Sequence, residues 1–343
     1  MNEALDLAVL LDTLRNTPAM RSKQAIQQPA AVIGSAEQAL TREQLYALPG
    51  DDTAAIACGD HFQLLAIEGM LPDFVEAAPW FAGWSAVMAN VSDITAMGGR
   101  ATAVVNAYWH HDTAGAQQLL AGIRAACEAY GLLLAGGHTS LAAANPAALA
   151  VAITGIAQTL LSTLHAAPGQ IIAMAVDLEG NWHADSTYWK AFEGVPAERL
   201  RSKLEVLPRL AEAALLHAAK DISNAGVLGS LLMLLETTGC GATVDLASLP
   251  CPPNADLARW LQVFPSYGFL MTLEERDWAQ VQTAFAFEGV RCERIGRIND
   301  SGLLNVQSGQ QRGEFWNLRE QPFTGFNYHS LDLTPLNLKH QEH

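Results

Sequence analysis

The feature that most constrains the fold is an alternation of strand-like and helix-like hydrophobic patterns along the first half of the chain. The strand patterns fall at residues 62–68, 101–108, 132–135 and 147–156, and the helical patterns at residues 79–97 and 113–130. Strands that alternate with helices are typical of folds in which helices cover a sheet. The sequence therefore predicts a mixed α/β protein.

A second α/β set follows a candidate domain junction at residues 159–170. This stretch carries turn chemistry at Pro168-Gly169 and precedes a fresh apolar strand, IIAMAVDL. Further patterns predict helices around residues 196–219 and 225–237, and strands near residues 242–246, 267–273 and 290–295. We therefore expect two domains, residues 1–158 and 159–343.

Composition narrows the class of protein. Half of the 343 residues are hydrophobic and 16% are charged, so the chain can bury a large core. The formal net charge of −15 would repel nucleic acid and anionic membrane surfaces, so neither is an expected partner. The first 16 residues show helical spacing without a signal-type pattern, and no apolar run reaches the roughly 18 to 20 residues that span a bilayer. These features predict a cytoplasmic protein.

The cysteines support a reducing compartment. All five are widely spaced and none forms a CxxC pair, which argues against a zinc site and against a disulfide framework. They are Cys58, Cys127, Cys240, Cys251 and Cys292.

The motifs of several common enzyme classes are absent from the sequence. None of the five lysines follows a glycine, so the chain has no P-loop. It also lacks a GxGxxG after a strand, a GxSxG elbow and an HExxH motif. The chemistry must therefore be sought in other residues.

Five segments place acidic or amide side chains beside glycines. They are PGDDTAAI at residues 49–56, AIEGM at 66–70, NVSDITAMGGR at 90–100, GGHTS at 136–140 and DISNAG at 221–226. Oxygen ligands of this kind suit Mg²⁺, and glycines let a ligand approach the backbone.

Each segment also has a structural explanation. The Asp51-Asp52 pair could form an ordinary turn, and Asp221 with Asn224 could cap a helix. Gly98-Gly99 could simply end a helix, and His138 could be a buried histidine with a satisfied hydrogen bond. No single motif decides between these explanations and ligand binding.

The predicted helix at residues 79–97 carries a stronger signal. One face is broadly apolar, whereas the other begins with small residues and ends with Asn90 and Asp93, one turn apart. A carboxylate near the C-terminal end of a helix is disfavoured by the helix dipole, and a bound cation would relieve it. This favours a metal ligand at Asp93.

The order of the motifs resembles the aminoimidazole ribonucleotide (AIR) synthetase superfamily. That superfamily includes thiamine monophosphate kinase, selenophosphate synthetase, the hydrogenase-maturation carbamoyl dehydratase and formylglycinamide ribonucleotide amidotransferase. NVSDITAMGG is the most specific piece of a resemblance that runs from about residue 45 to residue 300. It implies an N-terminal α/β domain whose sheet pairs with its twin in a homodimer, and a C-terminal α/β domain that closes over ATP and Mg²⁺.

The resemblance also implies roles for individual residues. The implied metal ligands are Asp51, Asp52, Glu68, Asp93 and Asp221. These five and six further residues are expected to bind the nucleotide cofactor: Asn90, Gly98, Gly99, Gly136, Gly137 and Asn224. Lys23, in the segment ahead of the GDD motif, and His138 are the catalytic candidates, although Lys23 could instead be a solvated lysine near the terminus.

Three positions depart from the commoner family pattern. Glu68 stands where many members have Asp, and His138 stands where the kinase branch has Asp in GGDT. Asn224-Ala225 replaces an Asp-Gly pair, which weakens the metal assignment for that loop.

The discriminating groups of the known branches are missing. No cysteine precedes Cys58, the chain ends in LNLKHQEH, and GGDT is absent, which leaves a separate AIR synthase-related branch. We expect an ATP-dependent ligase, cyclo-ligase or dehydratase that phosphorylates a carbonyl or amide oxygen of a small molecule. A small-molecule kinase and a non-catalytic nucleotide-binding dimer are the alternatives.

Overall fold

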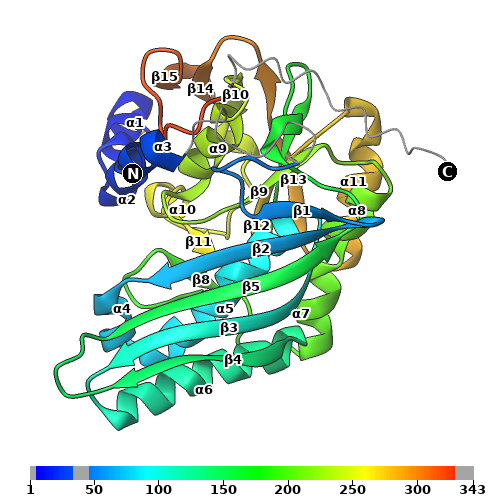
Figure 1. Ribbon diagram of the computed structural model, residues 1–343. Helices are drawn as coiled ribbons and strands as arrows, with labels where there is room; N and C mark the ends of the chain where they lie inside the picture. The colour runs from blue at the N-terminus through cyan, green and yellow to red at the C-terminus, as the bar shows by residue number, and fades with distance from the viewer. Residues whose placement is uncertain (1–4, 34–45, 329–343) are drawn as a thin grey trace.

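Two β-sheets, one in each half of the chain, organise the structure (Figure 1). The computed structural model describes residues 5–33 and 46–328. Helices lie against both sheets, so the predicted mixed α/β class is confirmed.

The first sheet has five strands in the order β1-β2-β5-β3-β4. Its strands are β1 (Ala54–Cys58), β2 (His61–Met70), β3 (Arg100–His110), β4 (Leu133–Leu141) and β5 (Ala148–Ala157). Only the β3–β4 pair is parallel, because α6 (Thr113–Tyr130) crosses between those strands. Helices α5 (Pro79–Ala96) and α6 cover one face, and none of the helices in residues 5–33 and 46–328 covers the face turned toward the viewer in Figure 1.

Helix α5 is buried on all sides, which the two-faced pattern did not predict. Every residue from Phe81 to Ala96 is buried, because the helix lies between the first sheet, α6 and parts of the second half of the chain. Two glycines let α5 and α6 approach closely. A Cβ at Gly83 would meet the Leu119 carbonyl oxygen at 2.1 Å, and one at Gly122 would meet the Trp80 carbonyl oxygen at 1.9 Å.

The second sheet has seven strands in the order β15-β14-β10-β13-β6-β12-β9. Its strands are β6 (Ile171–Val176), β9 (Ala218–Asp221), β10 (Gly241–Asp245), β12 (Gly268–Leu273), β13 (Arg291–Asn299), β14 (Leu303–Ser308) and β15 (Gln311–Asn317). A small sheet of β7 (Asn181–Trp182), β8 (Tyr188–Lys190) and β11 (Phe264–Pro265) accompanies it. The remaining helices here are α7 (Ala197–Leu204), α8 (Val206–Glu212), α9 (Gly226–Glu236), α10 (Leu257–Trp260) and α11 (Trp278–Phe287).

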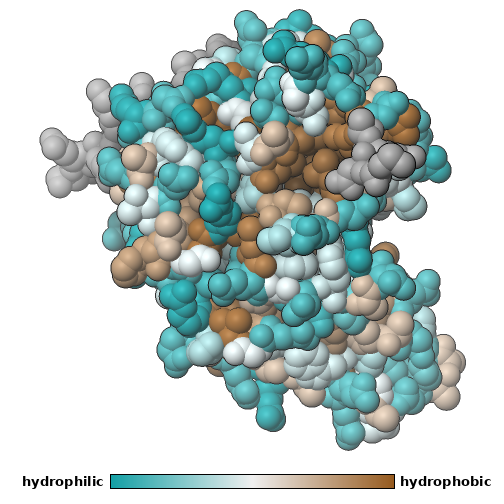
Figure 2. Space-filling view, turned by 180° about the vertical axis from the view of Figure 1, so that it is seen from behind, coloured by the Kyte–Doolittle hydropathy of each residue, from teal (hydrophilic) through white to brown (hydrophobic). Residues whose placement is uncertain are grey.

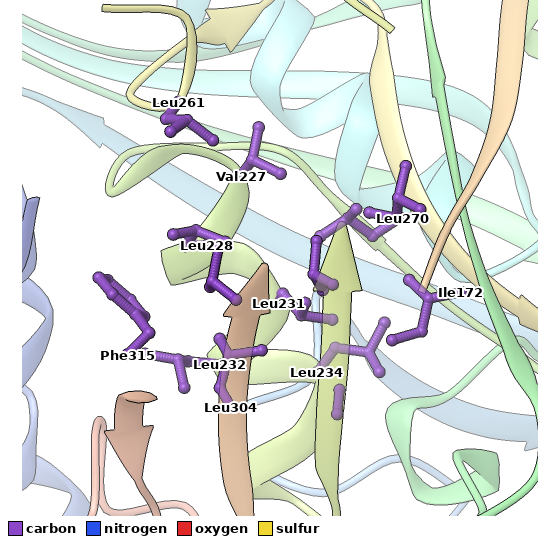
Figure 3. Close-up of a cluster of buried hydrophobic side chains, with 14 of the residues drawn as sticks. Ile172, Val227, Leu228, Leu231, Leu232, Leu234, Leu261, Leu270, Leu304 and Phe315 are labelled. Carbon is purple, nitrogen blue, oxygen red and sulfur yellow. The ribbon is translucent and has the colours of Figure 1, made fainter. Parts of the chain in front are cut away.

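Helix α9 forms the centre of the second core. It is apolar all round, and its leucines pack against Ile172 of β6, Leu270 of β12, Leu304 of β14 and Phe315 of β15 (Figure 3). A helix that is hydrophobic on every side must be buried to be stable. The side of the molecule opposite to the view of Figure 1 is mainly hydrophilic, with apolar side chains gathered in patches (Figure 2).

Two local predictions were wrong. The single helix expected around residues 196–219 is two helices, α7 and α8, followed by strand β9. Ala214 adopts φ 55°, a left-handed conformation that helices do not continue through. The GGHTS motif lies within strand β4 instead of following a strand, because residues 133–141 pair along β3.

The amino-terminal segment packs on the second half of the chain. Helix α1 (Leu7–Arg15), capped by Asp6, is the predicted amphipathic helix, and α2 (Pro18–Gln24) and α3 (Gln27–Ile33) follow it. Leu7, Leu10, Leu11 and Leu14 belong to the same core as Phe315 of β15. The domain boundary between residues 158 and 159 stays a prediction. That boundary would group residues 5–33 with the first sheet, but their buried side chains pack in the core of the second sheet. Among the described residues, no helix is both long and apolar enough to cross a membrane.

Candidate functional site

An acidic cavity of about 210 Å³ lies where the two halves of the chain meet. Charged side chains reach it from α2, β2, α5, β9 and the turn before β1. They are Lys23, Asp51, Asp52, Glu68, Asp93, Lys220 and Asp221. The structure thus brings together all five predicted metal ligands and one of the two predicted catalytic residues.

Asp52, Asp93 and Asp221 form the tightest group in the cavity. One carboxylate oxygen from each lies within 4.8 Å of the others. Burial, followed by repulsion from Asp221 and Glu68, raises the pKa of Asp93 well above its usual range. Burial and the charge of Asp52 raise the pKa of Asp221 to about 7. Burial and mutual repulsion therefore both disfavour the ionised forms of Asp93 and Asp221.

Glu68 borders this group from β2. Burial raises the pKa of Glu68, and Asp52 adds to the effect, whereas Lys23 and Lys220 oppose it. Its carboxylate lines the cavity but does not belong to the three-carboxylate group.

Asp51 is held by hydrogen bonds from the start of the second half of the chain. Its Oδ1 accepts from the Thr163 amide at 3.1 Å and from Thr163 Oγ1 at 3.0 Å, and its Oδ2 accepts from Ser162 Oγ. Burial raises the pKa of Asp51 to about 6, although the hydrogen bond from Ser162 opposes this. Asp51 therefore ties the GDD turn to the segment that carries Ser162 and Thr163.

Lys220 is a cavity residue that sequence reasoning missed. Its ammonium group donates to Asp52, and the Asp221 amide donates to the other oxygen of Asp52 at 3.3 Å. Burial disfavours the charged lysine, but Asp52, Asp221 and Asp51 outweigh that effect and the net pKa of Lys220 is raised. The sequence did contain a signal for Lys220, because this residue directly precedes the predicted ligand Asp221 in the short strand β9.

Lys23 reaches the same cavity from α2, whose Met20 is buried in the second core. It is half-buried, and its charge lowers the pKa values of Glu68 and Asp221 against the other influences there. Lys23 thus lies on an ordered helix over the acidic cluster.

Asn90 does not line the cavity. It is fully buried, and its Nδ2 donates to the Ala86 carbonyl at 2.7 Å and to the Val151 carbonyl at 2.9 Å, which links α5 to β5. Its Oδ1 has no hydrogen-bond partner among the described residues. A role in nucleotide binding stays a prediction for this residue.

Gly98 and Gly99 also lie outside the cavity, at the end of α5. The Gly98 amide donates to the Thr95 carbonyl and the Gly99 amide to the Ile94 carbonyl, both at 2.9 Å, which is the Schellman arrangement. Gly98 adopts φ 78°, and a Cβ at Gly99 would lie 2.4 Å from Leu64 Cδ1. The structure therefore supports the helix-ending interpretation of this pair.

Gly136, Gly137 and His138 lie on β4, at the edge of the first sheet and away from the lining of the cavity. The His138 side chain is exposed, with its ring centroid 6.0 Å from that of Trp109. The structure does not bring these three residues to the acidic cluster, so their predicted roles stay predictions.

Asn224 lines the cavity in the loop that precedes α9. The following residue, Ala225, adopts φ 90°, a left-handed conformation that usually requires glycine. Ala225 therefore places backbone strain next to the cavity wall.

A carboxyl-terminal loop covers one side of the cavity through Thr324 and Phe326. Glu236, buried at the end of α9, accepts from the backbone amides of Phe323, Thr324 and Gly325 at 2.6, 2.8 and 3.1 Å. It also accepts from Thr324 Oγ1 at 2.6 Å. Glu236 therefore holds this loop in place.

The sequence matches two family descriptions on either side of the cavity. Residues 50–157 match "AIR synthase related protein, N-terminal domain", and residues 173–309 match "AIR synthase related protein, C-terminal domain". The uncharacterised protein sll0787 of Synechocystis is 41% identical over 81% of this chain and 86% of its own length. The uncharacterised protein MJ0640 of Methanocaldococcus jannaschii is 32% identical over 68% of this chain and 72% of its own.

Solved structures share the fold. The structure described as T. maritima PurL complexed with ATP has a TM-score of 0.68 at 16% identity and covers 94% of this chain. This chain spans about half of that PurL, 55% of its length. AaThiL complexed with AMPPCP and TMP has a TM-score of 0.58 at 16% identity and covers 78% of this chain and 91% of its own. Because residues 50–157 and 173–309 match the two domain descriptions of that family, the chain belongs to the AIR synthase-related family.

Proposed function

We propose that the protein is a Mg·ATP-dependent enzyme that activates a carbonyl or amide oxygen of a small molecule by phosphorylating it. Members of the family are ATP-dependent kinases, ligases and dehydratases. In the proposed reaction the substrate oxygen attacks the γ-phosphorus and ADP leaves. The phosphorylated oxygen then departs as inorganic phosphate when a nucleophile attacks the carbon or when an amide is dehydrated.

The convergence of Asp52, Asp93 and Asp221 carries this proposal. Five carboxylates and two ammonium groups line the cavity, so three negative charges are uncompensated if all these groups ionise. Mg²⁺ binds a few carboxylates and leaves its other positions to water and phosphate oxygens. The donor set therefore fits Mg²⁺, which would bring the polyphosphate of ATP into an otherwise repulsive pocket.

The chain's own residues would position the reactants. Asp52 is oriented by Lys220 and by the Asp221 amide, and Asp51 fixes the turn that carries it. Lys23 presents an ammonium group that could neutralise charge on the transferred phosphoryl group. In phosphoryl transfer, positioning and charge stabilisation supply most of the catalysis.

A thermal-shift experiment tests the cofactor. Mg·ATP at about a hundred times its dissociation constant should add roughly 2.7 kcal/mol to the unfolding free energy. Asp93→Asn should abolish this shift, whereas Asp60→Asn, a change of an exposed carboxylate in the same half of the chain, should retain it. The proposal fails if Mg·ATP leaves the melting temperature of the wild type unchanged, or if Asp93→Asn shifts as the wild type does.

Labelled ATP distinguishes the reaction classes. With the γ-phosphate labelled, a ligase or dehydratase releases labelled inorganic phosphate, whereas a small-molecule kinase keeps the label on its product. ATP binding without turnover on any tested substrate would favour a non-catalytic nucleotide-binding dimer.

The open face of the first sheet supports the proposal of a homodimer. Ile56, Leu65, Ile67 and Val105 are exposed, and the strand pairing puts them on one face of the sheet. No helix of the described residues covers that face (Figure 1). Adjacent exposed apolar residues on a sheet face favour burial against a partner, and a second copy offers the same apolar surface.

Light scattering tests the homodimer. The wild type should have the mass of a dimer, and Ile67→Asp should reduce it to that of a monomer. Phe287→Asp, which changes an exposed apolar residue on α11, should not do so. A monomeric wild type at micromolar concentration would contradict the dimer.

We also place the protein in the cytoplasm, where its five free cysteines would stay reduced.

A further inference from the structure

The loop of residues 322–328, here called the strap, is anchored at three places around the cavity. At its start, Gln27 Nε2 of α3 donates to the carbonyls of the first two strap residues at 2.8 and 3.2 Å. In its middle, Glu236 at the end of α9 accepts from three strap amides. At its end, Tyr328 contacts the turn that precedes β1. The strap therefore joins elements that are far apart in the sequence.

The end of the strap holds the GDD turn directly. The Tyr328 hydroxyl donates to the Pro49 carbonyl at 2.9 Å. Phe326 lies against Gly50, which adopts φ 104°, and a Cβ at Gly50 would lie 2.6 Å from Phe326 Cβ. Only glycine allows this approach in this backbone conformation. The next two residues of the chain are the aspartates of the GDD motif, so the strap contacts the turn immediately before them.

A second route runs from the strap to Asp51 through buried threonines. The Tyr328 amide donates to the Thr237 carbonyl at 3.1 Å. Thr237 and Thr163 are buried, and their hydroxyl oxygens lie 3.0 Å apart. Thr163 in turn donates to Asp51 from its amide and its hydroxyl. Tyr328 is therefore connected to Asp51 both through the backbone of the turn and through this chain of hydrogen bonds.

Tyr328 acts from outside the cavity. It is only 3% exposed and does not line the cavity. Burial, followed by the charges of Asp51 and Glu236, raises the pKa of Tyr328 to about 12, so the hydroxyl keeps its proton and remains a donor. Any effect of this hydroxyl on a ligand in the cavity must therefore pass through the GDD turn.

We propose that the strap positions the GDD turn for the binding of Mg·ATP, and that Tyr328 is its positioning residue. This inference rests on the proposed function and adds a structural requirement for it. A turn that is already held in place loses less conformational entropy when a ligand binds. Through Gln27 the strap also holds α3, which follows the helix that carries Lys23. The strap thus connects two sets of cavity residues that precede the first sheet in the sequence.

Hydrogen exchange of the metal-free protein tests the contact without ATP. Tyr328→Phe removes only the hydroxyl, and the net free energy of one hydrogen bond corresponds to about a fivefold change in an equilibrium constant. The Asp51 amide donates to the Leu48 carbonyl at 3.1 Å within the turn. In Tyr328→Phe this amide should exchange about fivefold faster, because the turn opens more often.

Tyr267→Phe is the matched control. The buried Tyr267 hydroxyl also donates to a backbone carbonyl, that of Lys203 at 2.8 Å, and neither residue lines the cavity. The two variants therefore lose the same kind of hydrogen bond. Exchange of the Asp51 amide in Tyr267→Phe should equal that of the wild type.

Calorimetry with Mg·ATP provides the functional measurement. Tyr328→Phe should raise the dissociation constant about fivefold, whereas Tyr267→Phe should bind as the wild type does. A role of Tyr328 confined to stability would leave the dissociation constants of both variants unchanged. Unchanged exchange of the Asp51 amide in Tyr328→Phe, or equal Mg·ATP affinity of this variant and the wild type, would overturn the inference. A wild type that binds no Mg·ATP would instead contradict the proposed function, and the exchange measurement alone would then support or overturn the hold of the strap on the turn.

Discussion

Lys220 forms an ion pair with Asp52 in which both side chains are almost wholly buried, with 5% and 3% of their surfaces exposed. The two residues come from different halves of the chain and meet beside the carboxylates of Asp93 and Asp221. A buried ion pair contributes little net stability, but the loss of one partner leaves an uncompensated charge. The pair therefore links the stability of the protein to the organisation of the cavity.

Lys220→Met should lower the free energy of unfolding by about 3 to 5 kcal/mol and abolish ATP turnover. The matched control is Lys190→Met, because Lys190 pairs with the half-exposed Glu193 at 2.6 Å and such a pair contributes about 1 kcal/mol or less. Chemical denaturation of both variants checks the prediction, and equal losses of stability would contradict it.

Lys23→Ala should lower ATP turnover by orders of magnitude while the fold and the mass of the assembly stay unchanged. The reason is that Lys23 lies over the acidic cluster, where an ammonium group can neutralise phosphoryl charge. Arg21→Ala, an exposed change on the same helix, serves as the control. If the ATP turnover of Lys23→Ala stays within about twofold of the wild type, Lys23 has no role in phosphoryl transfer and is a solvated lysine.

Asp93→Asn should raise the melting temperature of the metal-free protein, although it removes a proposed ligand. Burial and neighbouring carboxylates raise the pKa of Asp93, so its ionised form destabilises the folded state at neutral pH. Asp177→Asn should have the opposite effect, because buried Asp177 is paired with Lys203 at 2.5 Å. A lower melting temperature for metal-free Asp93→Asn would contradict this interpretation.

The metal-free protein should lose stability as the pH rises from about 4 to about 7. The pKa values of Asp51 and Asp221 are raised in the folded state, to about 6 and about 7, against a usual value of 3.8. Their contribution to stability is therefore complete below pH 3.8 and is lost as the pH rises through 6 and 7. Denaturation in EDTA across this range measures the slope, and Asp221→Asn should flatten it. A flat or rising profile in the wild type would show that these shifts are absent.

Glu236→Gln should lower the free energy of unfolding by about 3 kcal/mol or more. In the wild type both carboxylate oxygens of Glu236 accept hydrogen bonds from the backbone amides of residues 323–325. A glutamine side chain has only one acceptor oxygen, and its NH₂ group would face the remaining amide donors. Some of these buried amides would therefore lose their partners. Glu320→Gln, an exposed change nearby in the sequence, should be close to neutral. Equal unfolding midpoints for the two variants would rule out this role for Glu236.

The sequence by itself determined the mixed α/β class, the family and most strands and helices. These depend on local periodicity and on short motifs, which a linear pattern carries in full. The end of α5 at Gly98-Gly99 is an example, because a Schellman arrangement is specified within a few residues. Where local signals conflicted with tertiary packing, as in the broken helix at residues 196–219, the sequence reading was wrong.

The composition of the cavity was decided by the tertiary structure. Lys220 and Asp52 are 168 residues apart, and no pattern within a window of the sequence links them. Packing also decides the places of Asn90 and His138, although both belong to motifs that resemble ligand-binding segments. Asn90 forms a hydrogen bond from α5 to β5, and His138 lies on the edge strand β4. A motif shows which residue types are available near a turn. Which of them meet across the two halves of the chain depends on how the sheets and helices pack, because burial and charge compensation act between residues that are distant in sequence.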